Sequence, residues 1–166
     1  NRHNSLLHSF CVLFSPKCDK PIQMKSSRSK PRKVAIALEM HWGHKRHQET
    51  YAGCLNYANE AGWNCVITPN SERVLQPKKN ERPFDGVLAR ASKSMAQTAG
   101  QLGLPIVNVW LNSPASQVPS VLPDFEESGR IAAKHLMSRG FKRFGYLGYH
   151  RDLDAKRQNE GFRSIL

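Results

Sequence analysis

Apolar and polar positions alternate in blocks from Lys33 onward, and these blocks predict a series of strands and helices. KVAIALEM (33–40) is a β-branched apolar run that ends at a polar segment, which is typical of a strand buried on both faces. HQETYAGCLNYANEAG (47–62) has apolar residues at helical spacing and ends in a glycine, so it predicts a helix. Similar patterns predict strands at 63–69, 84–92, 104–111 and 142–149, and helices at 93–103, from Asp124 to Gly140, and at 154–166.

This order of elements predicts the fold class. Strands that alternate with helices, and that are apolar on both faces, indicate an α/β protein with a doubly wound parallel sheet and right-handed crossovers. Two segments fit less well. SERVLQPKKNERP (71–83), broken by Pro77, is either a truncated helix or a loop, and VPSVLP (118–123) is a short strand-like stretch within a loop. The length of 166 residues allows one domain with a core of ordinary size.

Positive charge is concentrated in the first part of the chain. Before Val34 there are eight Lys and Arg residues against Asp19 alone, which accounts for seven of the twelve net positive charges. A basic tail can attract nucleic acid or an anionic membrane surface. SSRSKPRK (26–33), however, has no aromatic residue to stack on a base and no helical period. We therefore expect residues 1–32 to be a disordered basic leader and residues 33–166 to be the folded part.

The leader contains one apolar run, LLHSFCVLF (6–14). It is too short to span a membrane, His8 interrupts it, and no small-residue cleavage site follows, so we expect neither a signal peptide nor a membrane partner. Met24 is the expected biological start. The four cysteines form no CxxC pair and no His cluster stands near them at zinc spacing, so we expect no metal, no cofactor and a reducing cytoplasm.

PDFEESGRIAAKHLMSRGFKRFGYLG (123–148) contains the most specific pattern in the chain. Asp124 can cap a helix, and Glu127 completes a capping box. The carboxylate of Asp124 could equally accept hydroxyls of a sugar, and composition alone does not separate these two roles. Gly129 and Ala133 would permit close packing. We expect the inward face of this helix to consist of Ser128, Ile131, Ala132, His135 and Leu136.

Residues 118–148 resemble the V-x-x-D-N-x-x-G-x-x-A-x-x-H-L-x-x-x-G-H pattern of the lactose-repressor and periplasmic-binding-protein superfamily. The resemblance covers residues 33–166 and closes on R-x-x-x-G-F-R-x-x-L at 157–166. Phe125 stands where the family commonly has Asn, and Phe141 replaces the usual His. AIALEM, DGVLAR and LPIVNV are most similar to the xylose operon regulators, whose AraC-type DNA-binding region follows the sugar domain.

The resemblance implies the amino-terminal lobe of a periplasmic-binding-protein-like type I domain, with the second lobe and the DNA-binding region beyond Leu166. It implies a cytoplasmic, dimeric transcription regulator that binds a small sugar, xylose being the best single choice. The alternative is the sugar-binding subunit of a transport system, which would need a secretion signal. An enzyme is not expected, because the sequence has no nucleophile elbow and no Gly-rich phosphate loop after the first strand.

In the fold that the resemblance implies, the ligand lies at the carboxyl ends of the strands. Trp42 and Trp110 could stack on a sugar ring, or they could be packing aromatics. Arg90 could donate two hydrogen bonds to the ligand, or it could pair with Glu39 or Asp124. His41, His44 and His47 could suggest a metal, but their mixed spacing disfavours it. The expected ligand-binding residues are Glu39, His41, Trp42, Arg90, Trp110 and Asp124.

Overall fold

The computed structural model describes residues 11–12, 30–40, 46–68, 75 and 84–166. The chain divides into two compact units. The first, called here the sheet unit, comprises residues 15–120, and the second, the hairpin unit, comprises residues 1–14 and 121–166. The predicted segment 71–83 lies outside the described residues apart from Leu75.

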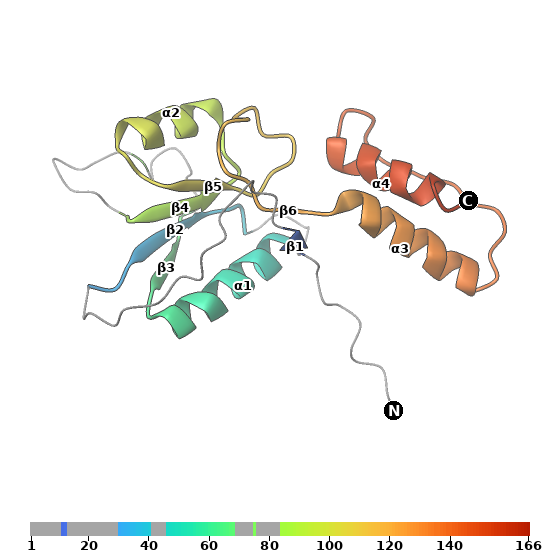
Figure 1. Cartoon of the computed structure of the whole chain (residues 1–166), viewed down its shortest axis with the longest axis horizontal. Coiled ribbons are helices and arrows are strands. Elements are labelled where there is room, and N and C mark those ends of the chain that lie inside the picture. The colour runs from blue at the N-terminus through green and yellow to red at the C-terminus, as the bar shows by residue number, and fades with distance from the viewer. Residues whose placement is uncertain (1–10, 13–29, 41–45, 69–74, 76–83) are drawn as a thin grey trace, which may run out of the picture. The chain divides into compact units, whose positions relative to one another are not determined.

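The sheet unit contains four parallel strands flanked by helices. The strands are β2 (Lys33–Ala37), β3 (Asn64–Ile67), β4 (Gly86–Ala89) and β5 (Ile106–Asn108), and they lie in the order β3-β2-β4-β5. Helices α1 (Arg46–Ala61) and α2 (Lys93–Gln101) lie on opposite faces of this sheet (Figure 1). The predicted α/β class with a parallel sheet is therefore confirmed. The four strands β2, β3, β4 and β5 and the helices α1 and α2 also follow one another along the chain as predicted.

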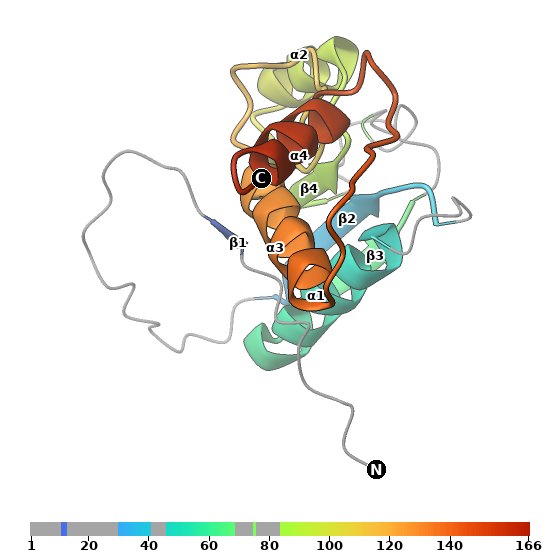
Figure 2. The same cartoon turned by 90° about the vertical axis from the view of Figure 1, so that its right-hand side faces the viewer.

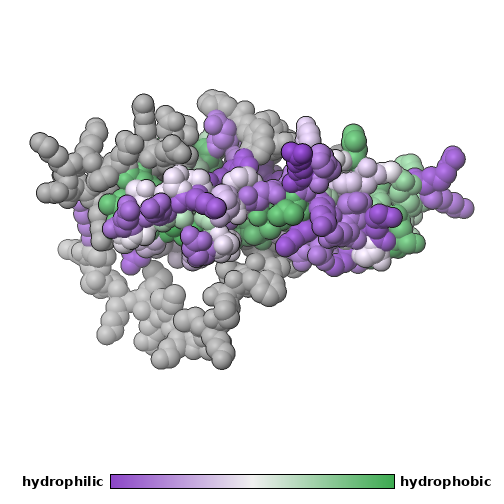
Figure 3. Space-filling view, turned by 90° about the horizontal axis from the view of Figure 1, so that it is seen from above, coloured by the Kyte–Doolittle hydropathy of each residue, from purple (hydrophilic) through white to green (hydrophobic). Residues whose placement is uncertain are grey.

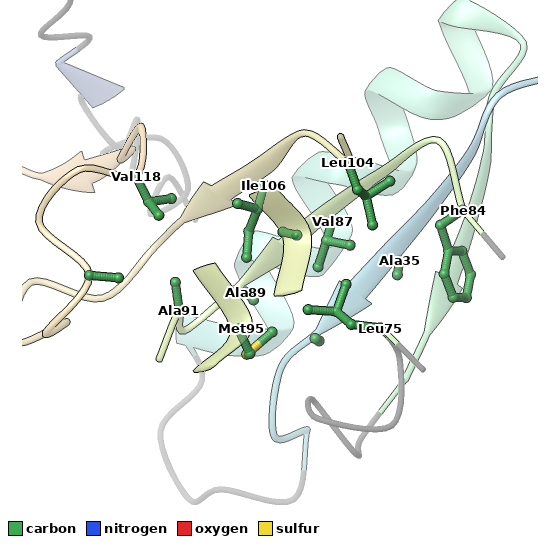
Figure 4. Packing of buried hydrophobic residues seen from close by; sticks show 13 residues of the cluster. Ala35, Leu75, Phe84, Val87, Ala89, Ala91, Met95, Leu104, Ile106 and Val118 are labelled. Carbon is green, nitrogen blue, oxygen red and sulfur yellow. The ribbon is translucent and has the colours of Figure 1, made fainter. Parts of the chain in front are cut away.

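The core of the sheet unit lies mainly between the central strands and α2. Met95 of α2 and Leu75 are almost fully buried against side chains from β2, β4 and β5 (Figure 4). The apolar residues of these strands are buried or half-buried, because helices cover the faces of a parallel sheet. The cluster consists of Ala35, Ala37, Leu75, Phe84, Val87, Ala89, Ala91, Met95, Ala99, Leu104, Ile106, Ala115 and Val118.

The helices of the sheet unit begin and end where the sequence predicts. The hydroxyl of Ser92 accepts a hydrogen bond from the backbone N–H of Met95 at 3.2 Å and so caps α2. Gly62 follows α1 with a φ of 67°, and Gly103 follows α2 with a φ of 58°. Glycine adopts this left-handed conformation without the steric cost that a Cβ atom imposes, which explains why both helices end there.

The hairpin unit contains two short strands and two helices. Strand β1 (Cys11–Val12), which lies within the segment expected to be disordered, pairs antiparallel with β6 (Leu122–Pro123). Helices α3 (Phe125–Ser138) and α4 (Leu153–Arg163) lie side by side (Figures 1 and 2). Both were predicted from the sequence, and their bounds differ from the expected ones by three residues or fewer.

Glycines allow α3 and α4 to approach closely. A Cβ atom at Gly129 would lie 2.7 Å from the backbone nitrogen of Phe162, and one at Gly161 would lie 2.8 Å from the Cα atom of Glu126. Real Cβ atoms essentially never approach other atoms this closely. The predicted role of Gly129 and Ala133 in close packing is confirmed, because both are buried.

The predicted inward face of α3 is wrong for most of its members. Ser128, Ile131, Ala132 and His135 are exposed, and Leu136 is half-buried. The buried residues of α3 are Phe125, Gly129 and Ala133, because helix packing here is decided by which residues let two backbones approach and not by which are most apolar.

The strand predicted at 142–149 is also wrong. No strand is found there in the described part of the chain, although the helices on either side are present. Phe144 packs edge-on against Phe162 with ring centroids 5.8 Å apart, and the hydroxyl of Tyr146 donates to the carbonyl oxygen of Ala155 at 2.8 Å. Alternating apolar residues indicate which side chains share a side of the chain, but a strand also needs a neighbouring strand as hydrogen-bonding partner.

Apolar side chains reach the surface mostly in the hairpin unit. Of ten large hydrophobic residues exposed among those described, eight belong to this unit. Figure 3 shows hydrophobic patches among hydrophilic side chains on one face of the molecule. Leu147 is fully exposed, and Tyr149 is 85% exposed. None of the helices described in this chain has the length and apolar character needed to cross a lipid bilayer.

Candidate ligand-binding edge

Three of the predicted ligand-binding residues follow neighbouring strands at one edge of the sheet. Because the strands are parallel, their carboxyl ends meet there, and Ala37, Ala89 and Asn108 are in register across β2, β4 and β5. Glu39 follows β2, Arg90 follows β4 and Trp110 follows β5. Open α/β sheets bind ligands in the crevice outside these carboxyl ends. The sheet therefore places these three residues at the edge where a ligand is expected.

Arg90 and Trp110 are in direct contact. The guanidinium carbon of Arg90 lies 4.5 Å from the centroid of the Trp110 ring, which is a cation–π arrangement, and both residues are half-buried. The planar guanidinium group carries five N–H donors that point outward in its own plane. The pair can thus present an aromatic surface and hydrogen-bond donors close together.

Asn108, at the end of β5, organises the loops that carry this pair. Its side chain is almost fully buried, at 2% exposure. Its Oδ1 accepts from the backbone N–H groups of Ala91 and Trp110, both at 3.1 Å. Its Nδ2 donates to the carbonyl oxygen of Trp110 at 2.8 Å and to the hydroxyl of Ser120 at 3.0 Å. The residues after β4 and after β5 are therefore joined through one amide.

Ser113 adds a second link between the same two loops. Its hydroxyl donates to the carbonyl oxygen of Ala91 at 2.6 Å and accepts from the backbone N–H of Ala115 at 3.1 Å. Asn108 and Ser113 thus hold the two backbone polar groups of Ala91, directly after Arg90. Neither residue was among the predicted ligand-binding residues. A polar amide within the apolar strand LPIVNVWL was the available signal for Asn108, since buried polar groups must find hydrogen-bond partners.

His47 connects the start of α1 to Glu39, two residues after β2. It is the second residue of α1, it is buried, and its Nδ1 lies 2.8 Å from the carbonyl oxygen of Glu39. A ring with its proton on Nδ1 donates this hydrogen bond. The side chain of Glu39 itself is exposed at the edge. In the described ranges no three His, Cys, Asp or Glu residues are grouped as a metal site would require.

The remaining predicted residues are not placed at this edge. His41 and Trp42 lie outside the described residues. Asp124 belongs to the hairpin unit, where its Oδ1 accepts from the backbone N–H of Glu127 at 2.9 Å and caps α3, as predicted. The predicted capping box is not completed among the described residues, because the carboxylate of Glu127 accepts a hydrogen bond from Arg130 at 2.9 Å instead of from the backbone N–H of Asp124. Whether Asp124 also contacts a ligand stays a prediction.

The two cysteines that the structure describes in the sheet unit, Cys54 and Cys65, are poor candidates for a nucleophile. The Sγ atom of Cys65 lies 3.9 Å from the carbonyl oxygen of Cys54. Both cysteines are free thiols. Burial raises the pKa of Cys54, and the neighbouring Cys65 raises it further. Burial also raises the pKa of Cys65. Both side chains are therefore neutral thiols at physiological pH, whereas the thiolate is the reactive form.

Solved structures similar to this chain are transcription regulators and sugar-binding proteins. The regulator CcpA of Lactococcus lactis matches with a TM-score of 0.61 and 18% identity over 82% of this chain and 54% of its own. The regulator CelR in complex with cellobiose matches with a TM-score of 0.59 and 21% identity over 82% and 46%. A periplasmic binding protein/LacI regulator from Alkaliphilus metalliredigens, complexed with D-xylulofuranose, matches with a TM-score of 0.59 and 12% identity over 81% and 52%.

These similarities define the class of fold. The chain has the α/β fold with a parallel sheet found in regulators and sugar-binding proteins of the periplasmic-binding-protein-like type. It spans about half the length of these solved structures. No protein-family model matches the sequence. No curated protein matches it significantly either.

Proposed function

We propose that this chain is the ligand-sensing part of a DNA-binding transcription regulator. In this proposal it binds a small sugar, xylose being the first choice, at the edge formed by the residues after β2, β4 and β5. The regulator acts in the cytoplasm as a homodimer and contacts DNA through a region that this chain does not contain. Ligand binding would shift the regulator between two arrangements of its lobes and so change its affinity for DNA.

The contact between Arg90 and Trp110 carries this proposal. Sugars present C–H faces that stack on indole rings, and hydroxyls that accept hydrogen bonds from a guanidinium. Both groups occur here 4.5 Å apart, at the carboxyl ends of two adjacent parallel strands. The exposed Glu39, just after the neighbouring strand β2, would supply a carboxylate as hydrogen-bond acceptor for the same ligand.

Titration calorimetry of the full chain with D-xylose, D-ribose, L-arabinose and D-glucose tests the proposal. We expect one of these sugars to bind, and the Trp110→Ala variant to weaken that binding by about five- to thirtyfold, because a lost stacking contact costs about 1–2 kcal/mol. Arg90→Lys keeps the charge but removes the planar group, so it should also weaken binding. If the unchanged chain binds no sugar of such a panel, the sugar-sensing role is wrong.

The chain offers a matched control for these variants. Arg32 lies over the ring of Trp63 at 5.5 Å from its centroid, which is the same type of contact, but these residues precede β2 and β3 at the opposite end of the strands. Trp63→Ala should therefore leave sugar affinity within about twofold, since it removes a comparable contact away from the carboxyl edge. Equal losses from Trp63→Ala and Trp110→Ala would contradict the placement of the site.

A further inference from the structure

Asn108 uses every hydrogen-bonding group of its side-chain amide within the protein. A primary amide has two N–H groups and one oxygen with two lone pairs. Both N–H groups are engaged, by the carbonyl oxygen of Trp110 and the hydroxyl of Ser120, and the oxygen accepts from Ala91 and Trp110. The side chain is also 2% exposed. A ligand therefore could not reach this amide without breaking a bond that already exists.

These bonds fix both members of the stacked pair through their backbones. Asn108 holds Trp110 at its N–H and at its carbonyl oxygen, so the indole-bearing residue is restrained on both sides. It holds the N–H of Ala91, the residue directly after Arg90. The 4.5 Å contact between Arg90 and Trp110 thus depends on two loops that one amide joins.

We propose that Asn108 is a positioning residue, which sets the affinity of this edge for its ligand by holding Arg90 and Trp110 together without touching the ligand. This inference rests on the proposed function for the ligand, but the geometry at Trp110 can be tested without it. A binding group that is already ordered loses less conformational freedom when the ligand arrives, so its restraint increases affinity. The residue acts through its neighbours, and its loss should appear at the Trp110 ring.

The first test compares Asn108→Ala with Leu104→Ala in the full chain. Leu104 is a buried core residue just before the amino end of β5, so its truncation destabilises the same strand away from the carboxyl edge. The readouts are the indole N–H signal of Trp110 in a ¹H–¹⁵N spectrum, assigned with Trp110→Phe, and the calorimetric affinity for the sugars named above. Asn108→Ala should move this signal and weaken binding by about tenfold or more, as expected when buried hydrogen bonds are lost.

Leu104→Ala should leave the Trp110 signal in place and the affinity within about twofold, because no bond to the edge is lost. A second variant, Ser120→Ala, removes only one of the four amide contacts at an exposed residue and keeps the protein testable if Asn108→Ala does not fold. It should move the same signal in the same direction by a smaller amount.

The outcomes are distinguishable. If Asn108→Ala or, where that variant is unfolded, Ser120→Ala leaves the Trp110 signal and the affinity as they were, Asn108 is not a positioning residue. If Leu104→Ala lowers the affinity as much as Asn108→Ala, the effect is general destabilisation and the inference is wrong. If the unchanged chain binds no sugar, the proposed function fails, while the response of the Trp110 signal to Asn108→Ala still supports or overturns the positioning role.

Discussion

Packing within the sheet unit differs from packing within the hairpin unit. In the sheet unit, side chains fill the space between strands and helix, and its largest buried residues include Ile36, Leu75 and Met95. In the hairpin unit, α3 and α4 meet at Gly129 and Gly161, where a side chain would collide with backbone. The sheet unit leaves two large hydrophobic residues exposed among those described, and the hairpin unit leaves eight.

This difference indicates that the two units respond to opposite kinds of substitution. A unit held by side-chain volume loses stability when atoms are removed, because a cavity remains. A unit held by close backbone approach loses stability when atoms are added, because the helices must move apart. Three substitution experiments follow, each set against a control in the other unit or at the same site, and then one chemical-modification experiment.

Truncation in the core of the sheet unit should have the largest effect. Met95 is 2% exposed and Met95→Ala should lower the free energy of unfolding by about 2–5 kcal/mol, the usual range for buried large-to-small changes. Ile131 is 53% exposed on α3, so Ile131→Ala should change it by less than about 0.5 kcal/mol. Denaturant melts measure both. An equal loss at Ile131 would mean that the outer face of α3 is covered in solution.

Enlargement at the helix crossing should come next. Gly129→Ala should lower the free energy of unfolding by about 1–3 kcal/mol, since the added methyl group collides with the backbone of α4. Gly53, within α1, has open space at its Cβ position, so Gly53→Ala should raise the free energy of unfolding by about 0.5–1 kcal/mol through helix propensity. Both variants add one methyl group to a glycine, but the expected changes in the free energy of unfolding, measured by thermal or denaturant melts, have opposite signs. The same sign for both would contradict the close approach of the helices.

Two substitutions separate the two candidate roles of Asp124, helix cap and ligand contact. Asp124→Ala should cost about 1 kcal/mol, because the N-cap of α3 is lost. Asn is an equally good cap, so Asp124→Asn should change the free energy of unfolding by only a few tenths of a kcal/mol. A weakened sugar affinity in Asp124→Asn, measured by calorimetry, would identify the ligand role. Unchanged affinity would leave Asp124 a cap alone.

Cys54 and Cys65 should give the smallest effect on the free energy of unfolding, and this effect should depend on pH. The folded state raises the pKa of Cys54 and Cys65, so between the ordinary and the raised pKa it binds more protons than the unfolded state. This contribution to stability is therefore present below the ordinary thiol pKa and is lost as pH rises through the raised values. Alkylation by iodoacetamide at pH 7.5 should be slower in the native than in the denatured chain. Equal rates would contradict the protection.

The sequence predicts the sheet unit well because its signals are local. β2, α1, β3, β4, α2 and β5 each follow from the local pattern of apolar residues, and α1 also from its stop at Gly62. The sequence also predicts that Arg90 and Trp110 lie at the same edge of the sheet, because the carboxyl ends of parallel strands meet there. What the pattern could not give is the contact between them, because side-chain stacking depends on two loops whose geometry Asn108 and Ser113 determine.

The hairpin unit shows where pattern reading fails. The most apolar residues of α3, such as Ile131, were expected to be buried, but the glycine at 129 decides which face meets α4. The segment 142–149 alternates like a strand, yet Phe144 and Tyr146 pack on a helix instead. In both cases the missing information is the identity of the packing partner, which lies far along the sequence.

The exposed apolar residues between α3 and α4 affect how this protein behaves at high concentration. Leu147 and Tyr149 project from a stretch rich in residues that favour strands, and such stretches associate readily with copies of themselves. Lys142, Arg143 and Arg151 flank the stretch, and like charges of this kind keep neighbouring molecules apart. Salt shortens the reach of that repulsion, to about 8 Å at 0.15 M. The shelf life of a concentrated solution will therefore depend on its ionic strength.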